Sequence, residues 1–131
     1  LQPGVAPYHT NVGYAYFGMK MAVEAEEAFR RALLMDPFVF QQNDRTGSVL
    51  QDRSVEDKGL FAFTMAKSYA GTGDAAHCAA YLRRALDEGY KNMAQAYTDP
   101  GFATVLDAPE VQAVLSLIPA ASGAAAVPAS P

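Results

Sequence analysis

A pattern of small and large residues occurs twice in this chain, at a spacing of 53 residues. At each pair of matching positions, a small residue corresponds to a small one and a large residue to a large one. Gly13, Tyr16, Ala25, Phe29 and Ala32 form the first copy, and Ala66, Tyr69, Cys78, Leu82 and Ala85 form the second. Small residues at helical spacing let two antiparallel helices approach closely, while large ones fill the groove between them. The sequence therefore predicts two similar helical hairpins, and the pattern describes packing rather than chemistry.

The residues of the first copy also resemble a tetratricopeptide (TPR) repeat. In segment 6–39 a glycine stands three residues before a tyrosine, and A-x3-F-x2-A and a closing proline, Pro37, follow. Segment 59–92 is similar but has Ala66, Cys78 and Tyr90 where the family has glycine, alanine and proline. A TPR repeat is about 34 residues long, so the offset leaves about 19 further residues between the hairpins. The resemblance implies an all-α fold, a TPR-like α-α superhelix of antiparallel hairpins.

Turn and capping signals give the expected organisation of the chain. We expect long helices over 6–18, 22–35, 55–70 and 75–88, with Ser54 and Asp74 as N-caps and Gly89 as a C-cap. Two shorter helices near 92–97 and 109–117 resemble those that close bacterial TPR arrays. Residues 1–118 are thus predicted to be a TPR-like helical domain, with repeat one at 6–39, an insertion at 38–53, repeat two at 59–92 and closing helices at 92–118. The Ala/Pro/Ser-rich residues 119–131 are predicted to be a flexible tail.

The insertion at 38–53 is a candidate for a functional segment. It contains two short β-prone pieces, 38–40 and 48–50, separated by turn signals, which predicts a short β-hairpin or an ordered loop. Insertions between repeats often map to the binding face of a solenoid. The alternative is that the apolar residues of the insertion only cover the joint between the hairpins.

Charges on the helix expected at 22–35 indicate a solvated face. Glu26 and Glu27 precede Arg30 and Arg31 at i,i+4 spacing, the favourable order for surface ion pairs.

Composition narrows the class of partner. The chain has 131 residues, of which half are hydrophobic, and ten basic against fourteen acidic residues give a formal charge of −4. This balance, without a basic stripe, argues against nucleic acid as a partner. The sequence has neither an apolar run of about 18 residues nor a signal-peptide pattern, so we expect no membrane span. The lone Cys78 cannot form an internal disulfide, so the sequence does not indicate the redox compartment. The abrupt start at Leu1 suggests a processed protein or a fragment of a longer array.

The sequence has no clear pattern of catalytic or metal-ligating residues. His77 and Cys78 are adjacent, but neighbours on a helix point about 100° apart and cannot act as a base and its nucleophile. Cys78 replaces a small packing residue and is expected to be a buried, inert thiol. With two histidines and one cysteine, no metal-ligand spacing occurs. We therefore expect a protein that is not an enzyme and holds no metal or cofactor.

The resemblance implies recognition of a protein or peptide instead. In TPR-like proteins the first helix of each hairpin lines a concave groove, and its matching residues here are Thr10, Tyr14, Phe17, Leu60, Phe63 and Lys67. Aromatic residues with an isolated cation suit an interface. The predicted function is a non-catalytic interaction module, a scaffold or adaptor. The alternative is a structural or assembly subunit, or a homo-oligomer, whose groove is filled by its own chain or by another subunit.

Overall fold

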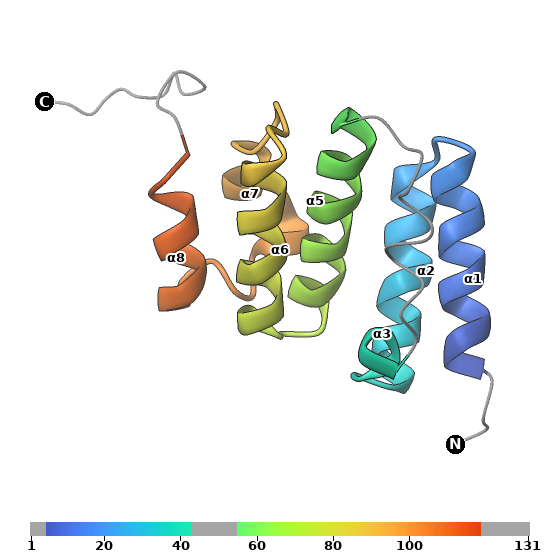
Figure 1. Cartoon of the computed structure of the whole chain (residues 1–131). Coiled ribbons are helices and arrows are strands. Elements are labelled where there is room, and N and C mark those ends of the chain that lie inside the picture. Colours follow the sequence, from blue (N-terminus) through green and yellow to red (C-terminus); the bar gives the residue numbers. More distant parts are fainter. Residues whose placement is uncertain (1–4, 43–54, 119–131) are drawn as a thin grey trace, which may run out of the picture.

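A computed structural model describes residues 5–42 and 55–118 of the chain (Figure 1). Within these two ranges the regular elements are all helices, as predicted, and no strand occurs. The β-prone piece at 48–50, the predicted cap Ser54 and the predicted tail at 119–131 lie outside the described residues.

Hairpin one consists of α1 (Val5–Gly18) and α2 (Ala22–Met35), which lie side by side in Figure 1. The turn between them includes Lys20, whose φ of 67° is in the left-handed region. Gly13 lies directly against the ring of Phe29: a Cβ atom at Gly13 would be 2.6 Å from Phe29 Cδ1. The predicted close approach of the two helices at this glycine is therefore present.

Hairpin two consists of α5 (Val55–Gly71) and α6 (Ala75–Asp87). Asp74 caps α6 as predicted, because its carboxylate accepts a hydrogen bond of 3.0 Å from the backbone N–H of His77. Gly89 follows the end of α6 with a φ of 81°, the left-handed conformation expected after a helix.

The repeated residues occupy buried positions in both hairpins. Side chains at three matching pairs of positions are completely inaccessible to solvent: Ala25 with Cys78, Phe29 with Leu82, and Ala32 with Ala85. The packing prediction made from the 53-residue pattern is confirmed at these positions.

Hairpin two packs on hairpin one mainly through α2 and α5 (Figure 1). Phe61 of α5 is fully buried at this contact. Its ring centroid lies 5.3 Å from that of Phe17, 5.9 Å from that of Phe29 and 6.2 Å from that of Tyr14. An aromatic cluster therefore forms the joint between the hairpins.

The start of the insertion is helical rather than β-prone. The short helix α3 (Val39–Gln42) follows hairpin one, so the prediction of a strand-like piece at 38–40 is wrong. Val39 and Phe40 are buried, and the Phe40 ring contacts Phe29 at 5.6 Å and Tyr69 at 6.3 Å. Burial against both hairpins outweighs the local β propensity of these residues. Phe40 covers the joint, as the alternative interpretation of the insertion expected, but Phe38 is 62% exposed, and Val49 and Leu50 lie outside the described residues.

Three short elements follow hairpin two: α7 (Gln95–Thr98), the 3-10 helix η1 (Pro100–Phe102) and α8 (Pro109–Leu115). α8 packs on α6 and buries Val111, Val114 and Leu115, while η1 packs on α5. The predicted short helices are therefore present, although each is shorter than expected. α8 lies beside α6 on the side away from hairpin one (Figure 1).

Candidate partner-binding site

The predicted site residues of hairpin one lie in or beside the core. Thr10 is 2% exposed, and its hydroxyl donates a hydrogen bond of 2.7 Å to the carbonyl oxygen of Pro7. Phe17 is buried against Phe61. Tyr14 is half-buried, with its ring 5.4 Å from that of Phe29. Of these three side chains, Tyr14 keeps the most accessible surface.

The predicted site residues of hairpin two meet the C-terminal segment. Phe63 is 4% exposed, and its ring lies 4.8 Å from that of Tyr90 and 5.2 Å from that of Phe102. Leu60, one residue before the buried Phe61, is half-buried. The aromatic surface expected at Phe63 is thus covered by residues that follow α6.

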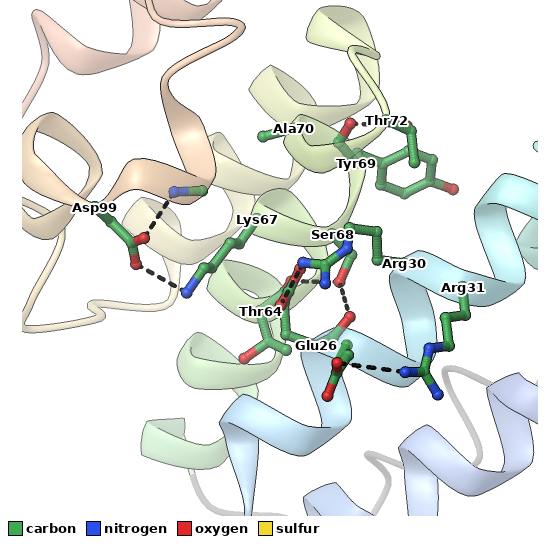
Figure 2. Close-up of polar contacts among 12 residues, drawn as sticks. Glu26, Arg30, Arg31, Thr64, Lys67, Ser68, Tyr69, Ala70, Thr72 and Asp99 are labelled. Atoms are coloured by element: carbon green, nitrogen blue, oxygen red, sulfur yellow. Dashed lines mark hydrogen bonds and ion pairs between the residues drawn. The ribbon is translucent and has the colours of Figure 1, made fainter.

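Lys67 forms an ion pair with the same segment (Figure 2). Its Nζ atom lies 3.0 Å from Oδ2 of Asp99, whose Oδ1 accepts a hydrogen bond of 2.9 Å from the backbone N–H of Gly101. A Cβ atom at Gly101 would lie 2.5 Å from Lys67 Cε, so the lysine side chain passes directly over this glycine. Lys67 and Asp99 each remain about a quarter exposed.

A cleft of about 170 Å³ separates α2, α5 and the C-terminal segment. It brings together the three predicted residues of hairpin two, whereas Thr10, Tyr14 and Phe17 do not line it. Its wall consists of Ala22, Val23, Glu26, Leu60, Phe63, Thr64, Lys67, Tyr90, Gln95 and Asp99.

Glu26 is the residue of this cleft whose surroundings differ from the prediction. It was predicted on a solvated face, yet it is 6% exposed because α5 packs over this part of α2. Arg30 Nη1 donates to both carboxylate oxygens, at 2.9 and 3.1 Å. Burial raises the pKa of the Glu26 carboxyl above its ordinary value, and the nearby Arg30 and Lys67 charges oppose that shift. The i,i+4 spacing predicted the ion pair but could not reveal the neighbouring helix.

The backbone under Glu26 also joins the two hairpins (Figure 2). Ser68 is fully buried, and its hydroxyl lies 3.3 Å from the carbonyl oxygen of Glu26 and 2.9 Å from that of Thr64. The cleft wall is therefore fixed by a polar contact between α2 and α5 as well as by apolar packing.

His77 and Cys78 have separate surroundings, as predicted. His77 Nδ1 lies 2.8 Å from Asp74 Oδ2, and its ring stacks on that of Tyr69 at 4.7 Å. Cys78 is completely buried, and burial raises the pKa of its thiol to about 12. A thiol with this pKa stays protonated near neutral pH and is a poor nucleophile. Among the described residues, no group of three or more His, Cys, Asp or Glu side chains is placed to hold a metal ion.

Comparisons of the chain with protein-family models, with curated proteins and with solved structures found no match. None of the helices in the described ranges is both long enough and apolar enough to cross a membrane.

Proposed function

We propose that this chain is a non-catalytic, TPR-like interaction module, a scaffold or adaptor that binds a peptide or partner protein at the cleft between α2 and α5. The observation that carries the proposal is that Leu60, Phe63 and Lys67, which the TPR resemblance selected, all line one cleft. The two hairpins, with matched buried positions, support the TPR-like assignment.

The size of the cleft favours a side chain of a partner over a small-molecule substrate. Pockets for drug-sized ligands usually measure about 300–1,000 Å³, whereas this cleft measures about 170 Å³. It suits one side chain presented by a larger molecule, with the rest of the partner lying across the rim. Val23, at the rim, is 72% exposed and offers apolar contact area.

The charges lining the cleft favour a basic side chain. Two carboxylates, Glu26 and Asp99, line the cleft with one ammonium group, that of Lys67, while the Arg30 guanidinium that pairs with Glu26 is not part of the wall. A lysine or arginine of the partner would place its apolar stem against Leu60 and Val23 and its charge toward the carboxylates. The buried, protonated Cys78 thiol is consistent with a non-catalytic role.

A matched pair of α2 variants tests this proposal. Val23 and Leu34 are both exposed apolar residues of α2, at 72% and 66%, but only Val23 lines the cleft. Peptides would be selected from a random phage-displayed library on the immobilised full chain. We expect the selected peptides to contain basic residues and to lose about tenfold in affinity, or about 1.4 kcal/mol, with Val23→Arg but not with Leu34→Arg. Peptides that bind both variants equally would place recognition elsewhere.

The second candidate is the assembly subunit whose groove is filled by its own chain. A specific observation favours it: residues after α6 already cover part of α5. Phe102 packs on Phe63, Asp99 pairs with Lys67, and the Thr104 hydroxyl donates a 2.9 Å hydrogen bond to the carbonyl oxygen of Ala70. If no cleft-dependent peptide is recovered and the molecular mass rises with concentration, this second function is supported over the first.

A further inference from the structure

Hairpin two contains a stack of three rings between α5 and α6. The Tyr69 ring lies nearly parallel to the rings of His77 and Tyr81, with centroids 4.7 and 5.6 Å away and an angle of 15° between the planes in each case. A carboxylate holds one of these rings, since His77 Nδ1 lies 2.8 Å from Asp74 Oδ2. A flat group that contains nitrogen and is fixed by a carboxylate therefore stacks on this tyrosine.

Hairpin one keeps the tyrosine but has neither of the rings that stack on it. At the 53-residue offset, Tyr16 of α1 corresponds to Tyr69 of α5. The residues of α2 at the positions of the two α6 rings are Glu24 and Ala28. All three residues of hairpin one border a cavity of about 190 Å³ between α1 and α2. The complete wall of this cavity consists of Tyr8, His9, Val12, Tyr16, Glu24, Glu27, Ala28 and Arg31.

Aromatic rings form the α1 side of the cavity. Tyr16 is half-buried, and the rings of Tyr8 and His9 are in edge contact, with centroids 5.3 Å apart. The faces of tyrosine rings attract cations, and the cation is more often arginine than lysine. Hairpin two contains such a contact, because the guanidinium carbon of Arg84 lies 5.0 Å from the centroid of the Tyr81 ring. The α1 side is therefore suited to a planar cation.

Carboxylates form part of the α2 side. Glu27 is paired with Arg31, whose Nη2 atom lies 3.5 Å from the Glu27 Oε2 atom. Glu24 lies in the first turn of α2 and is exposed. Among residues 5–42 and 55–118, no ion pair includes Glu24. A cation that entered the cavity would therefore meet a carboxylate that no described basic side chain neutralises.

A guanidinium group matches both sides of the cavity. It is planar and always charged, it stacks on aromatic faces, and it donates two parallel hydrogen bonds to a carboxylate. A lysine ammonium has the charge but lacks the plane. The volume of about 190 Å³ is below the 300–1,000 Å³ or so of pockets for drug-sized ligands. The cavity thus has room for one small group rather than for a large ligand.

We infer that the cavity between α1 and α2 is a binding site for a guanidinium group, which stacks on Tyr16 and donates hydrogen bonds to the Glu24 carboxylate. The bound group takes the position that the His77 ring has beside Tyr69 in hairpin two. The site is separate from the cleft of the proposed function, because no residue lines both. The guanidinium belongs either to a free guanidino compound or to an arginine of a peptide, and the experiment separates these two sources.

NMR titration of the full chain tests the site directly. The aromatic resonances of Tyr16, assigned by comparison with Tyr16→Leu, are followed while one of three probes is added: free arginine, the blocked tripeptide acetyl-Gly-Arg-Gly-amide, or its lysine analogue. We expect saturable shifts with arginine and with the arginine tripeptide, and binding of the lysine tripeptide that is weaker on the order of tenfold. Equal affinity for the two arginine probes would identify a free guanidino compound as the source, and tighter binding of the tripeptide would identify a peptide.

Variants of α2 locate the binding. Glu24→Gln, at an exposed position, should weaken binding of the arginine tripeptide on the order of tenfold. The matched control Glu110→Gln removes an exposed carboxylate of α8 and should leave the affinity unchanged. A double variant, Glu24→His with Ala28→Tyr, transfers the two rings of hairpin two into the cavity and should abolish binding. Because Ala28 is buried, the result from Glu24→Gln decides if the double variant does not fold.

Three results would overturn the inference. The first is the absence of saturable shifts at Tyr16, and the second is equal affinity for the arginine and lysine tripeptides. The third is binding that Glu24→Gln leaves unchanged. If Val23→Arg abolishes that binding instead, the arginine is held in the cleft of the proposed function, which Val23 lines.

Discussion

Glu26 and Arg30 form an ion pair in which Arg30 Nη1 donates to both carboxylate oxygens. The Glu26 side chain is only 7% exposed. One residue along, the same spacing gives Glu27 and Arg31, which are 3.5 Å apart and both more than half exposed. The difference comes from α5, which packs over Glu26 and not over Glu27. Two identical sequence motifs therefore have different electrostatic surroundings.

Glu26→Gln is expected to change the pH dependence of stability. Burial holds the pKa of the Glu26 carboxyl above its ordinary value of 4.5. The folded chain then binds this proton more tightly than the unfolded chain, so the contribution of Glu26 to the free energy of unfolding falls as pH rises through the window above 4.5. In urea unfolding, the stability of Glu26→Gln relative to the wild type should therefore increase as the pH rises above 4.5. An equal gain in Glu27→Gln would contradict this cause.

Gly13→Leu is expected to destabilise hairpin one by overpacking. The Phe29 ring occupies the space that any side chain at Gly13 needs, and overpacking of this kind costs about 1–3 kcal/mol. Urea unfolding of Gly13→Leu should show this loss, while Ala15→Leu on the exposed face of α1 should stay within about 0.5 kcal/mol of the wild type. Equal stability of both variants would mean that the helices are not in close contact at Gly13.

Phe63→Ala is expected to cost about 3–5 kcal/mol, the usual range for a buried phenylalanine. Phe63 is enclosed by Tyr90 and Phe102, so truncation leaves a cavity between α5 and the C-terminal segment. Phe38→Ala, at a residue 62% exposed, is the control and should change stability by less than about 0.5 kcal/mol. Thermal unfolding followed by circular dichroism measures both, and a neutral Phe63→Ala would show that this side chain is not held by the C-terminal segment.

Asp74→Ala is expected to cost about 0.5–2 kcal/mol through loss of the N-cap of α6. The Asp74 carboxylate holds both the backbone N–H and the ring of His77. Asp107→Ala removes an exposed carboxylate outside the helices and serves as the comparison. Chemical denaturation of the two variants gives the difference, and equal free energies of unfolding would argue against the cap.

The Cys78 thiol is expected to resist labelling in the folded chain. Its pKa of about 12 and its complete burial leave almost no accessible thiolate at pH 8. Reaction with a chromogenic disulfide reagent should be slow in buffer and fast in denaturant. Fast labelling of the native chain would show that hairpin two opens readily at α6.

Most of the helical hairpins could be predicted from the sequence, because their packing rests on residues within each hairpin. Gly13 and Phe29, which lie in contact, both belong to the pattern of small and large residues at helical spacing. The cleft could be predicted only in part: Leu60, Phe63 and Lys67 were selected, while Glu26 was assigned to solvent. Its burial depends on α5, about 40 residues later in the sequence. The periodicity of residues within α2 cannot indicate that a helix so far along the chain packs over it. The helical turn at Val39 was missed for the same reason, since Phe29 and Tyr69 together bury this segment.

Phe40 contacts a ring in each hairpin, Phe29 on one side and Tyr69 on the other. In helical arrays, overall stability is approximately the sum of what each unit contributes and what each junction between units contributes. A buried aromatic side chain that contacts both units adds to the stability of the junction. Unfolding of either hairpin would therefore expose part of the other to solvent. We therefore expect the two hairpins to melt together when heated, without a populated half-folded species.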